Sequence, residues 1–330
     1  MKERFIDIMR LIRWQNLLFL VILMWVMEKW LIVPLLFTYG NGLPEVLPTS
    51  MLWTLITSVV LITAGGYVIN DYFDIKIDRI NRPDRVIVGE TLTKPAAMRM
   101  SIGLSAVGVL LGGLVAWLCS SWTMGILILL MPGLLWFYSS SYKRQFIIGN
   151  LIVAFASAVV PMLLGLANEG MFQPFIIEHD LQPLYGELQP VIRVIYTWLG
   201  GFALMIFLYT WIREILKDLQ DQMGDRELEC RTLPIKIGEL WTKIVVTLLI
   251  LLTIGLLCWF CFGLLPFPHT WGSLSIRYLV FGLLVPLLCV LALTWAGRIS
   301  SDYRNAQLLM KFAMFLGLLY CYVINALLCA

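Results

Sequence analysis

The chain has 330 residues, of which 60% are hydrophobic and 14% are charged. Soluble domains typically contain about 45–50% apolar and about 25% charged residues, so this composition excludes an ordinary soluble fold. The formal net charge is only +3, which excludes a bulk electrostatic attraction for nucleic acid, and any argument from charge must rest on where the charges lie.

Apolar runs of about 20 residues, the length that crosses a bilayer as a helix, recur along the whole chain. They predict an all-α, polytopic membrane protein with nine transmembrane helices in a single domain over residues 1–330. The expected spans cover residues 15–37, 51–70, 96–118, 122–140, 147–167, 191–212, 241–265, 276–297 and 308–329. Glu28 and Lys29 interrupt the first run. They either mark the outer end of a shorter first helix or are functional ionisable residues within the span.

Basic residues gather at the N-terminus and in the segments that follow even-numbered spans. Of the 24 lysine and arginine residues, only Lys29, Arg193 and Arg277 fall elsewhere. By the positive-inside rule, the N-terminus and these segments are expected in the cytoplasm and the C-terminus outside. The membrane is expected to be the cytoplasmic membrane of a bacterium or an archaeon. The acidic segment 168–190 is expected to be a solvated connector on the outer side.

Two of the inner segments carry three aspartates each, at offsets i, i+3 and i+7. The first is NDYFDIKIDRINRPDR, with Asp71, Asp74 and Asp78; the second is REILKDLQDQMGDRE, with Asp218, Asp221 and Asp225. On an α-helix these offsets place three carboxylates within an arc of about 60°, so each segment can present them to one point. Each triad follows the second span of a four-span block, which suggests a parallel internal repeat of 1–146 and 147–307, followed by a ninth helix at 308–329.

Stacked carboxylates repel one another, and a hard divalent cation relieves that repulsion. Oxygen ligands without His or Cys favour Mg²⁺ over zinc, and Mg²⁺ is commonly bound by one or two carboxylates together with phosphate oxygens of a substrate. The six aspartates are therefore predicted to be metal ligands, on two opposing carboxylate faces that hold a magnesium-bound diphosphate. The alternative is that both triads are solvated acidic faces of cytoplasmic loops.

Basic and hydroxyl side chains near the triads are candidates for binding the diphosphate oxygens that no metal takes. Lys143 is the strongest candidate, because the run YSSSYK combines hydroxyls with an ammonium group at the end of a predicted helix. The predicted substrate-binding residues are Arg79, Arg85, Tyr138, Tyr142, Lys143, Arg213 and Lys217. Each basic residue taken alone is also explained as an anchor at the inner membrane surface.

The motifs resemble those of the UbiA superfamily of intramembrane prenyltransferases. The resemblance rests on the first triad preceded by Asn70 and followed by RINRPDR, on the second triad followed by TLPIKIG, and on YSSSYKR with Gly149-Asn150. It implies a nine-helix bundle with cytoplasmic Asp-rich loops. It also implies Mg²⁺-dependent transfer of a prenyl group from a polyprenyl diphosphate, such as geranylgeranyl diphosphate, to a lipophilic acceptor.

The resemblance also implies roles for single residues. The implied catalytic residues, which stabilise the leaving diphosphate directly or through magnesium, are Asp71, Asp74, Asp218, Asp221 and Lys143. Asn70 would bind and orient the diphosphate or a ligating carboxylate. Asn16 resembles a polar position near the substrate, and a hydrogen bond between helices is the alternative. Membrane lipids surround such a protein, and no nucleic-acid partner is expected.

The acceptor is predicted from the second motif, which is more similar to ether-lipid enzymes that prenylate a prenylglyceryl phosphate than to the 4-hydroxybenzoate branch. An aromatic acceptor of quinone biosynthesis, 4-hydroxybenzoate or dihydroxynaphthoate, is the alternative. A membrane transporter is the alternative from a different class. A transporter would carry polar residues near the middle of the membrane, whereas the ionisable clusters here lie at the cytoplasmic boundary.

Overall fold

The structure is a computed structural model that describes residues 2–40, 42–81, 86–178, 188–260, 262 and 273–328. Regular structure within these ranges is helical, without an extended strand. Nine helices in this part of the chain are long and apolar enough to cross a membrane. They begin and end within a few residues of most of the predicted bounds, so the all-α, nine-span prediction is confirmed for the described residues.

The chain divides into two compact units. Unit 1 contains Met1–Lys143 and Val159–Leu199, and unit 2 contains Arg144–Ala158 and Gly200–Ala330. The helices of the first stretch are α1 (Lys2–Leu11), α2 (Trp14–Met27), η1 (Glu28–Ile32), α3 (Val33–Tyr39), α4 (Thr49–Asn81), α5 (Lys94–Leu118) and α6 (Trp122–Ser140). The short helix η3 (Tyr142–Arg144) follows α6, and α7 (Ile148–Glu178) and α8 (Leu188–Gln220) contribute a part to each unit. The remaining helices of unit 2 are α9 (Gln222–Glu227), α10 (Leu233–Trp259), α11 (Ser273–Tyr278), η6 (Leu279–Leu284), α12 (Val285–Ala296) and α13 (Ser300–Leu328).

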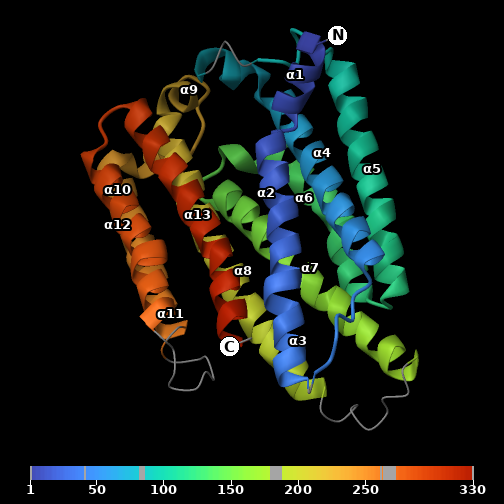
Figure 1. The fold of residues 1–330 in the computed structure, drawn as a ribbon. Helices are drawn as coiled ribbons and strands as arrows, with labels where there is room; N and C mark the ends of the chain where they lie inside the picture. Colours follow the sequence, from blue (N-terminus) through green and yellow to red (C-terminus); the bar gives the residue numbers. More distant parts are fainter. Residues whose placement is uncertain are drawn as a thin grey trace. The chain divides into compact units, whose positions relative to one another are not determined.

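Within unit 1, α4 and α5 lie side by side (Figure 1). Small residues let the two backbones approach, because a Cβ added at Gly65 or at Gly108 would lie 2.9 Å from a carbonyl oxygen of the other helix. The hydroxyls of Ser58 and Ser101 donate across this contact to the carbonyls of Gly108 and Gly65, at 2.7 and 2.9 Å. Close packing of small residues with hydrogen bonds between helices is typical of membrane interiors, and it fixes α4, which carries the first aspartate motif.

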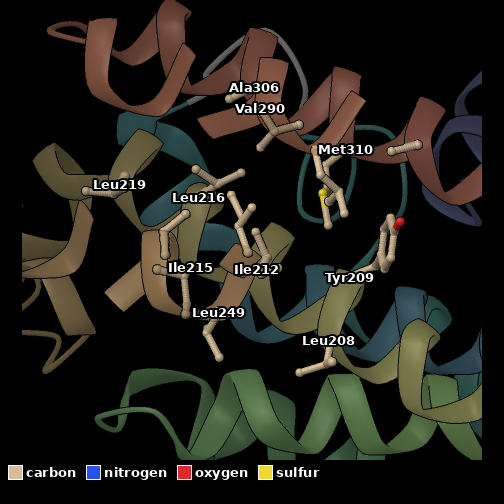
Figure 2. Packing of buried hydrophobic residues seen from close by; sticks show 14 of the residues in the cluster. Leu208, Tyr209, Ile212, Ile215, Leu216, Leu219, Leu249, Val290, Ala306 and Met310 are labelled. Atoms are coloured by element: carbon tan, nitrogen blue, oxygen red, sulfur yellow. The ribbon is translucent and has the colours of Figure 1, made fainter. Parts of the chain in front are cut away.

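Within unit 2, an apolar cluster surrounds the second half of α8 (Figure 2). Ile212 and Leu216 of α8 are four residues apart, so they share one helix face, and both are fully buried. Val290 of α12 and Met310 of α13 are fully buried in the same cluster. Burying a large aliphatic side chain contributes about 1.5–3 kcal/mol, so this cluster holds the end of α8, where the second aspartate motif begins.

Many large apolar side chains on the spans are exposed, among them Leu110, Trp117 and Phe281. Exposed apolar surface of this extent is incompatible with a protein surrounded by water. It suits helices whose outer faces contact lipid, with backbone hydrogen bonds satisfied inside each helix. The protein is an integral membrane protein.

One of the two interpretations of Glu28 and Lys29 was wrong, and so was one boundary prediction. Glu28 and Lys29 do not end the first helix, because the span continues through η1 and α3 to Tyr39. The segment 168–190 is not a connector from its first residue, because α7 runs through Glu178. The predicted fifth span ended at residue 167 because the polar residues Asn168 and Glu169 follow. In the structure, Asn168 donates to Glu28, and Glu169 accepts from the Tyr196 hydroxyl. Residues 179–187 lie outside the described residues.

Candidate active site

The first aspartate motif is part of a transmembrane helix. Asp71, Asp74 and Asp78 all lie on α4, which ends at Asn81. The prediction of an Asp-rich loop was therefore wrong for this motif, whereas the shared helix face is retained. The apolar run stops near residue 70, so the sequence predicted the helix end too early. The last turns of α4 are polar, and their aspartates form ion pairs with cationic side chains of unit 1.

Asp74 is the centre of the first cluster. It is buried, with 5% of its surface exposed. The amide of Asn70 donates to Asp74 Oδ2 at 2.8 Å, and the ammonium group of Lys143 donates to the same oxygen. Lys143 also lies 3.5 Å from Asn70 Oδ1. Three of the predicted site residues are thus in contact, although Lys143 is 69 residues from Asp74.

Lys143 is charged in this environment. Burial alone would lower its pKa, but the negative charge of Asp74 and the hydrogen bond to that carboxylate outweigh burial and raise the pKa of the Lys143 ammonium group above its usual range. A partly buried cation whose one ion pair among the described residues is with Asp74 is suited to bind a further anion. Of the neighbouring predicted residues, Tyr138 is buried at the end of α6 and Tyr142 is half-buried in η3.

Arg13 completes the first cluster and was not among the predicted site residues. It joins α1 to α2 in a left-handed conformation (φ 53°), which is uncommon for a residue other than glycine. Its guanidinium group donates to Asp71 Oδ1 at 2.9 Å and lies 4.7 Å from the ring centroid of Tyr67. Burial opposes the charge, yet Asp71 raises the pKa of Arg13 above its usual range. The Tyr67 hydroxyl accepts from Asn16 at 3.3 Å, so Asn16 lies in the same cluster.

The second aspartate motif has a different structure. Asp218 is near the end of α8, Asp221 lies between α8 and α9, and Asp225 is in α9. Asp221 has φ −94° and ψ 12°, which departs from helical values, so the helix is interrupted within the motif. The prediction that all three carboxylates lie on one face of a regular helix was therefore wrong here. The spacing gives no signal of the interruption, because an i, i+3, i+7 pattern is compatible with either backbone.

Neutral donors hold the carboxylates of the second motif. The amide of Asn150, from the unit 2 part of α7, donates to Asp218 Oδ2 at 2.8 Å. The hydroxyl of Thr232 donates to Asp225 Oδ2 at 3.0 Å, and both of these residues are buried. Asn150 and Thr232 belong to the sequence runs that carried the resemblance, but neither was predicted as a site residue.

The cations of the second motif pair with a glutamate that was also missed. Arg213 forms an ion pair with Glu214, and Lys217 Nζ lies 3.8 Å from the same carboxylate. Four polar side-chain atoms in this stretch of α8 are buried without a hydrogen-bond partner among the described residues: Tyr209 Oη, Thr210 Oγ1, Trp211 Nε1 and Arg213 Nε. Figure 2 shows Tyr209 at one end of the apolar cluster. Buried polar groups without partners are rare in folded proteins, and a catalytic role or a bound water or ion is among their explanations.

Two predicted substrate-binding residues remain. Arg79 lies at the end of α4, where its guanidinium group is 2.8 Å from Glu90 in an exposed ion pair. Arg85 lies outside the described residues.

The donor set suits Mg²⁺ that arrives with a substrate. Among the described residues, no group of three or more His, Cys, Asp or Glu side chains converges as a ready metal cage. Mg²⁺ does not require such a cage, because it is usually held by one or two carboxylates and by substrate phosphate oxygens. The carboxylates of the first motif are paired with the side-chain cations of Arg13 and Lys143. Those of the second motif accept hydrogen bonds from neutral side chains. A metal ion that arrives with a substrate could replace these partners.

Buried carboxylates and amides and a charged lysine, each near the end of a transmembrane helix, are features of an intramembrane prenyltransferase. The model of the UbiA prenyltransferase family matches residues 30–319. The chain belongs to this family and is a membrane-embedded prenyltransferase.

Relatives within the family are digeranylgeranylglyceryl phosphate synthases. The chain is 31% identical to the synthase of Ignicoccus hospitalis over 265 residues, which cover 79% of this chain and 77% of that protein. It is 32% identical to the Methanopyrus kandleri synthase over 260 residues (78% and 82% covered) and 34% identical to the Natronomonas pharaonis synthase over 269 residues (81% and 82% covered).

Solved structures show the same fold. A structure concerned with digeranylgeranylglyceryl phosphate synthase has a TM-score of 0.62 and 22% identity, and the match covers 98% of this chain and 99% of that one. A UbiA homologue from Archaeoglobus fulgidus bound to DMAPP and Mg²⁺ has a TM-score of 0.57 and 12% identity, with 94% and 98% covered. At these identities the likeness supports the fold alone.

Proposed function

We propose that the protein transfers a geranylgeranyl group from geranylgeranyl diphosphate to a prenylglyceryl phosphate, with release of diphosphate. The observation that carries the prenyl-transfer chemistry is the contact of Asp74 with Asn70 and Lys143 at the end of a transmembrane helix. The acceptor is supported by the similarity to digeranylgeranylglyceryl phosphate synthases.

The residues of the first motif act on the leaving group. Asp71 and Asp74 are the proposed metal ligands, together with Asp78. When Mg²⁺ is bound it neutralises diphosphate charge as the allylic C–O bond breaks. Lys143 exchanges its contact with Asp74 for a diphosphate oxygen, and Asn70 keeps the Asp74 carboxylate oriented. Arg13 holds Asp71 and contributes positive charge, and apolar helices exclude water from the allylic cation.

The residues of the second motif serve the same reaction. Asp218 and Asp221 are proposed metal ligands, together with Asp225. Asn150 orients Asp218 and Thr232 orients Asp225. The remaining proposed diphosphate-binding residues are Arg79, Arg85, Tyr138, Tyr142, Arg213 and Lys217. Asn16 is proposed to position the substrate through Tyr67.

The orientation in the membrane is part of the proposal. The N-terminus and both aspartate motifs face the cytoplasm and the C-terminus faces outward, because all lysine and arginine residues except Lys29, Arg193 and Arg277 lie in segments assigned to one side. Such an excess of basic residues is typical of cytoplasmic segments. Cysteine accessibility labelling at the exposed residues Glu90 and Phe262, in sealed vesicles of known orientation, tests this topology.

The activity is tested with purified protein in lipid vesicles, labelled geranylgeranyl diphosphate and three acceptors supplied separately. We expect a product with geranylgeranylglyceryl phosphate whose mass equals that of the acceptor plus one geranylgeranyl group less the hydrogen that the acceptor hydroxyl loses, and stoichiometric diphosphate release. Activity is expected to vanish with a chelator and to return with Mg²⁺. Product formed only with 4-hydroxybenzoate or dihydroxynaphthoate would replace the proposed acceptor, and uptake without diphosphate release would indicate transport instead.

A further inference from the structure

A buried acid and a buried amide form a pair inside unit 1, away from the aspartate motifs. Glu28 begins η1 and has 0% of its surface exposed, and Asn168 of α7 has 1% exposed. The Asn168 amide nitrogen donates to Glu28 Oε2 at 2.9 Å and to the Leu164 carbonyl at 3.0 Å. Glu28 is 12 residues from Asn16, which is about 18 Å along a helix, so the pair is not part of the first cluster.

The local backbone explains how an acid comes to be inside the span. Pro34 has no N–H to donate and its ring conflicts with the carbonyl four residues earlier, which disturbs a regular helix. The chain instead forms a π-helical turn in which the Val33 N–H donates to the Glu28 carbonyl. Such turns are rare within α-helices and are frequent at functional sites.

Glu28 is followed by a cation, Lys29, whose ion pair is with another carboxylate. The adjacent Lys29 donates to both carboxylate oxygens of Glu45, and the described residues contain no ion pair with Glu28. Burying an ionised carboxylate without a cationic partner costs far more than a single amide hydrogen bond returns. The ionised form of Glu28 is therefore incompatible with this position.

The hydrogen-bond pattern identifies what is missing. Glu28 Oε1 and Asn168 Oδ1 are both buried, and neither has a hydrogen-bond partner among the residues that the structure describes. A carboxyl group and a side-chain amide are both planar, and each has two polar atoms. One polar atom of each group is already used, because Asn168 Nδ2 donates to Glu28 Oε2. Both oxygens are acceptors when Glu28 is ionised, so neither can satisfy the other, whereas a proton on Glu28 Oε1 would supply a donor that the amide oxygen of Asn168 can accept.

We propose that Glu28 binds a proton and is held as the neutral carboxylic acid, with its Oε1–H donating to Asn168 Oδ1. The proton is taken from solvent and forms the Oε1–H bond, so the pair carries no charge and both polar groups are satisfied. A metal ion would need more oxygen ligands than these two. The acid–amide pair joins the first span to α7 in an environment where a charged pair would be costly.

The test is the infrared difference spectrum between the wild-type protein and Glu28→Gln, both in lipid vesicles. We expect the wild type to show one additional carbonyl band of a protonated carboxylic acid, which shifts in D₂O and is absent from Glu28→Gln. Loss of carboxylate bands in the variant, without loss of an acid band, would overturn the proposal, and it would indicate an ionised Glu28 with a bound cation.

A second measurement uses stability. Glutamine has the shape and the donor of the neutral acid, so Glu28→Gln is expected to fold and to keep the wild-type melting temperature and prenyl-transfer activity. Asn168→Leu removes both hydrogen bonds at similar volume and is expected to lower the melting temperature by several degrees. Failure of Glu28→Gln to fold, or a melting temperature as low as that of Asn168→Leu, would contradict a neutral Glu28.

Discussion

The two aspartate motifs have the same spacing in the sequence and different structures. In the first motif the helix is continuous, and its carboxylates Asp71 and Asp74 are paired with the cations Arg13 and Lys143. In the second motif the helix is interrupted at Asp221, and neutral donors hold Asp218 and Asp225. The same aspartate spacing thus has cationic partners in one unit and neutral hydrogen-bond donors in the other, and this difference predicts how each motif responds to substitution.

The largest effects are expected from Asp74→Asn and Asp218→Asn. Both remove a proposed metal ligand, and both are expected to lower turnover by about 10²–10³-fold, a typical loss when one group that stabilises developing charge is removed. Only Asp74→Asn leaves a largely buried cation, Lys143, without a carboxylate, so only this variant is expected to lose several kcal/mol of stability. Diphosphate release and thermal unfolding measure the two effects.

The control for this comparison is the double variant Asp74→Asn with Lys143→Met. This variant also removes the lysine that Asp74→Asn leaves without its carboxylate partner. Its melting temperature is therefore expected to be close to that of the wild type, while it remains inactive. Equal melting temperatures for Asp74→Asn and Asp218→Asn would show that charge pairing does not distinguish the motifs.

A smaller effect is expected from single lysine substitutions. Lys143→Met removes the cation closest to Asp74 and is expected to raise the KM for the prenyl diphosphate by about 10–100-fold, the cost of one charge-assisted hydrogen bond. Lys217→Met is expected to raise it less, because Arg213 still pairs with Glu214. Initial rates at varied diphosphate concentration measure both, and a larger effect at Lys217 would reverse the assigned importance of the two cations.

Thr232→Val sharpens the role of neutral donors in the second motif. It removes the hydroxyl that donates to the buried Asp225, and leaving a buried acceptor unsatisfied costs about 1–3 kcal/mol. Thr232→Ser keeps the hydroxyl and is the matched control. Thermal unfolding is expected to show a loss for valine and little change for serine; equal losses would assign the effect to packing of the methyl group.

The smallest effect is expected from Arg79→Gln. Its partner Glu90 is exposed, and exposed ion pairs contribute about 0–1 kcal/mol. Thermal unfolding is expected to show no measurable change, and the KM for the diphosphate is expected to rise only a few-fold. A rise as large as that of Lys143→Met would make Arg79 a principal diphosphate ligand.

Much of the fold was predictable because the bilayer imposes it. A lipid interior requires long apolar helices, so the nine spans found in the described part of the chain follow from apolar runs alone. The span ends were less predictable where polar residues lie inside the membrane protein. Asn168 ended an apolar window, and its partner Glu28 is 140 positions away, a separation over which one sequence carries no pairing information.

The sequence by itself determined the class of protein, the two carboxylate motifs and the candidate lysine, because residue types, spacing and hydropathy are local properties. The tertiary structure decided which atoms meet: Lys143 with Asp74, Asn150 with Asp218, and Arg13 with Asp71. It also decided that one motif is a continuous helix and the other is interrupted. These outcomes depend on packing between distant segments, since that packing supplies the cations and donors that make buried carboxylates stable.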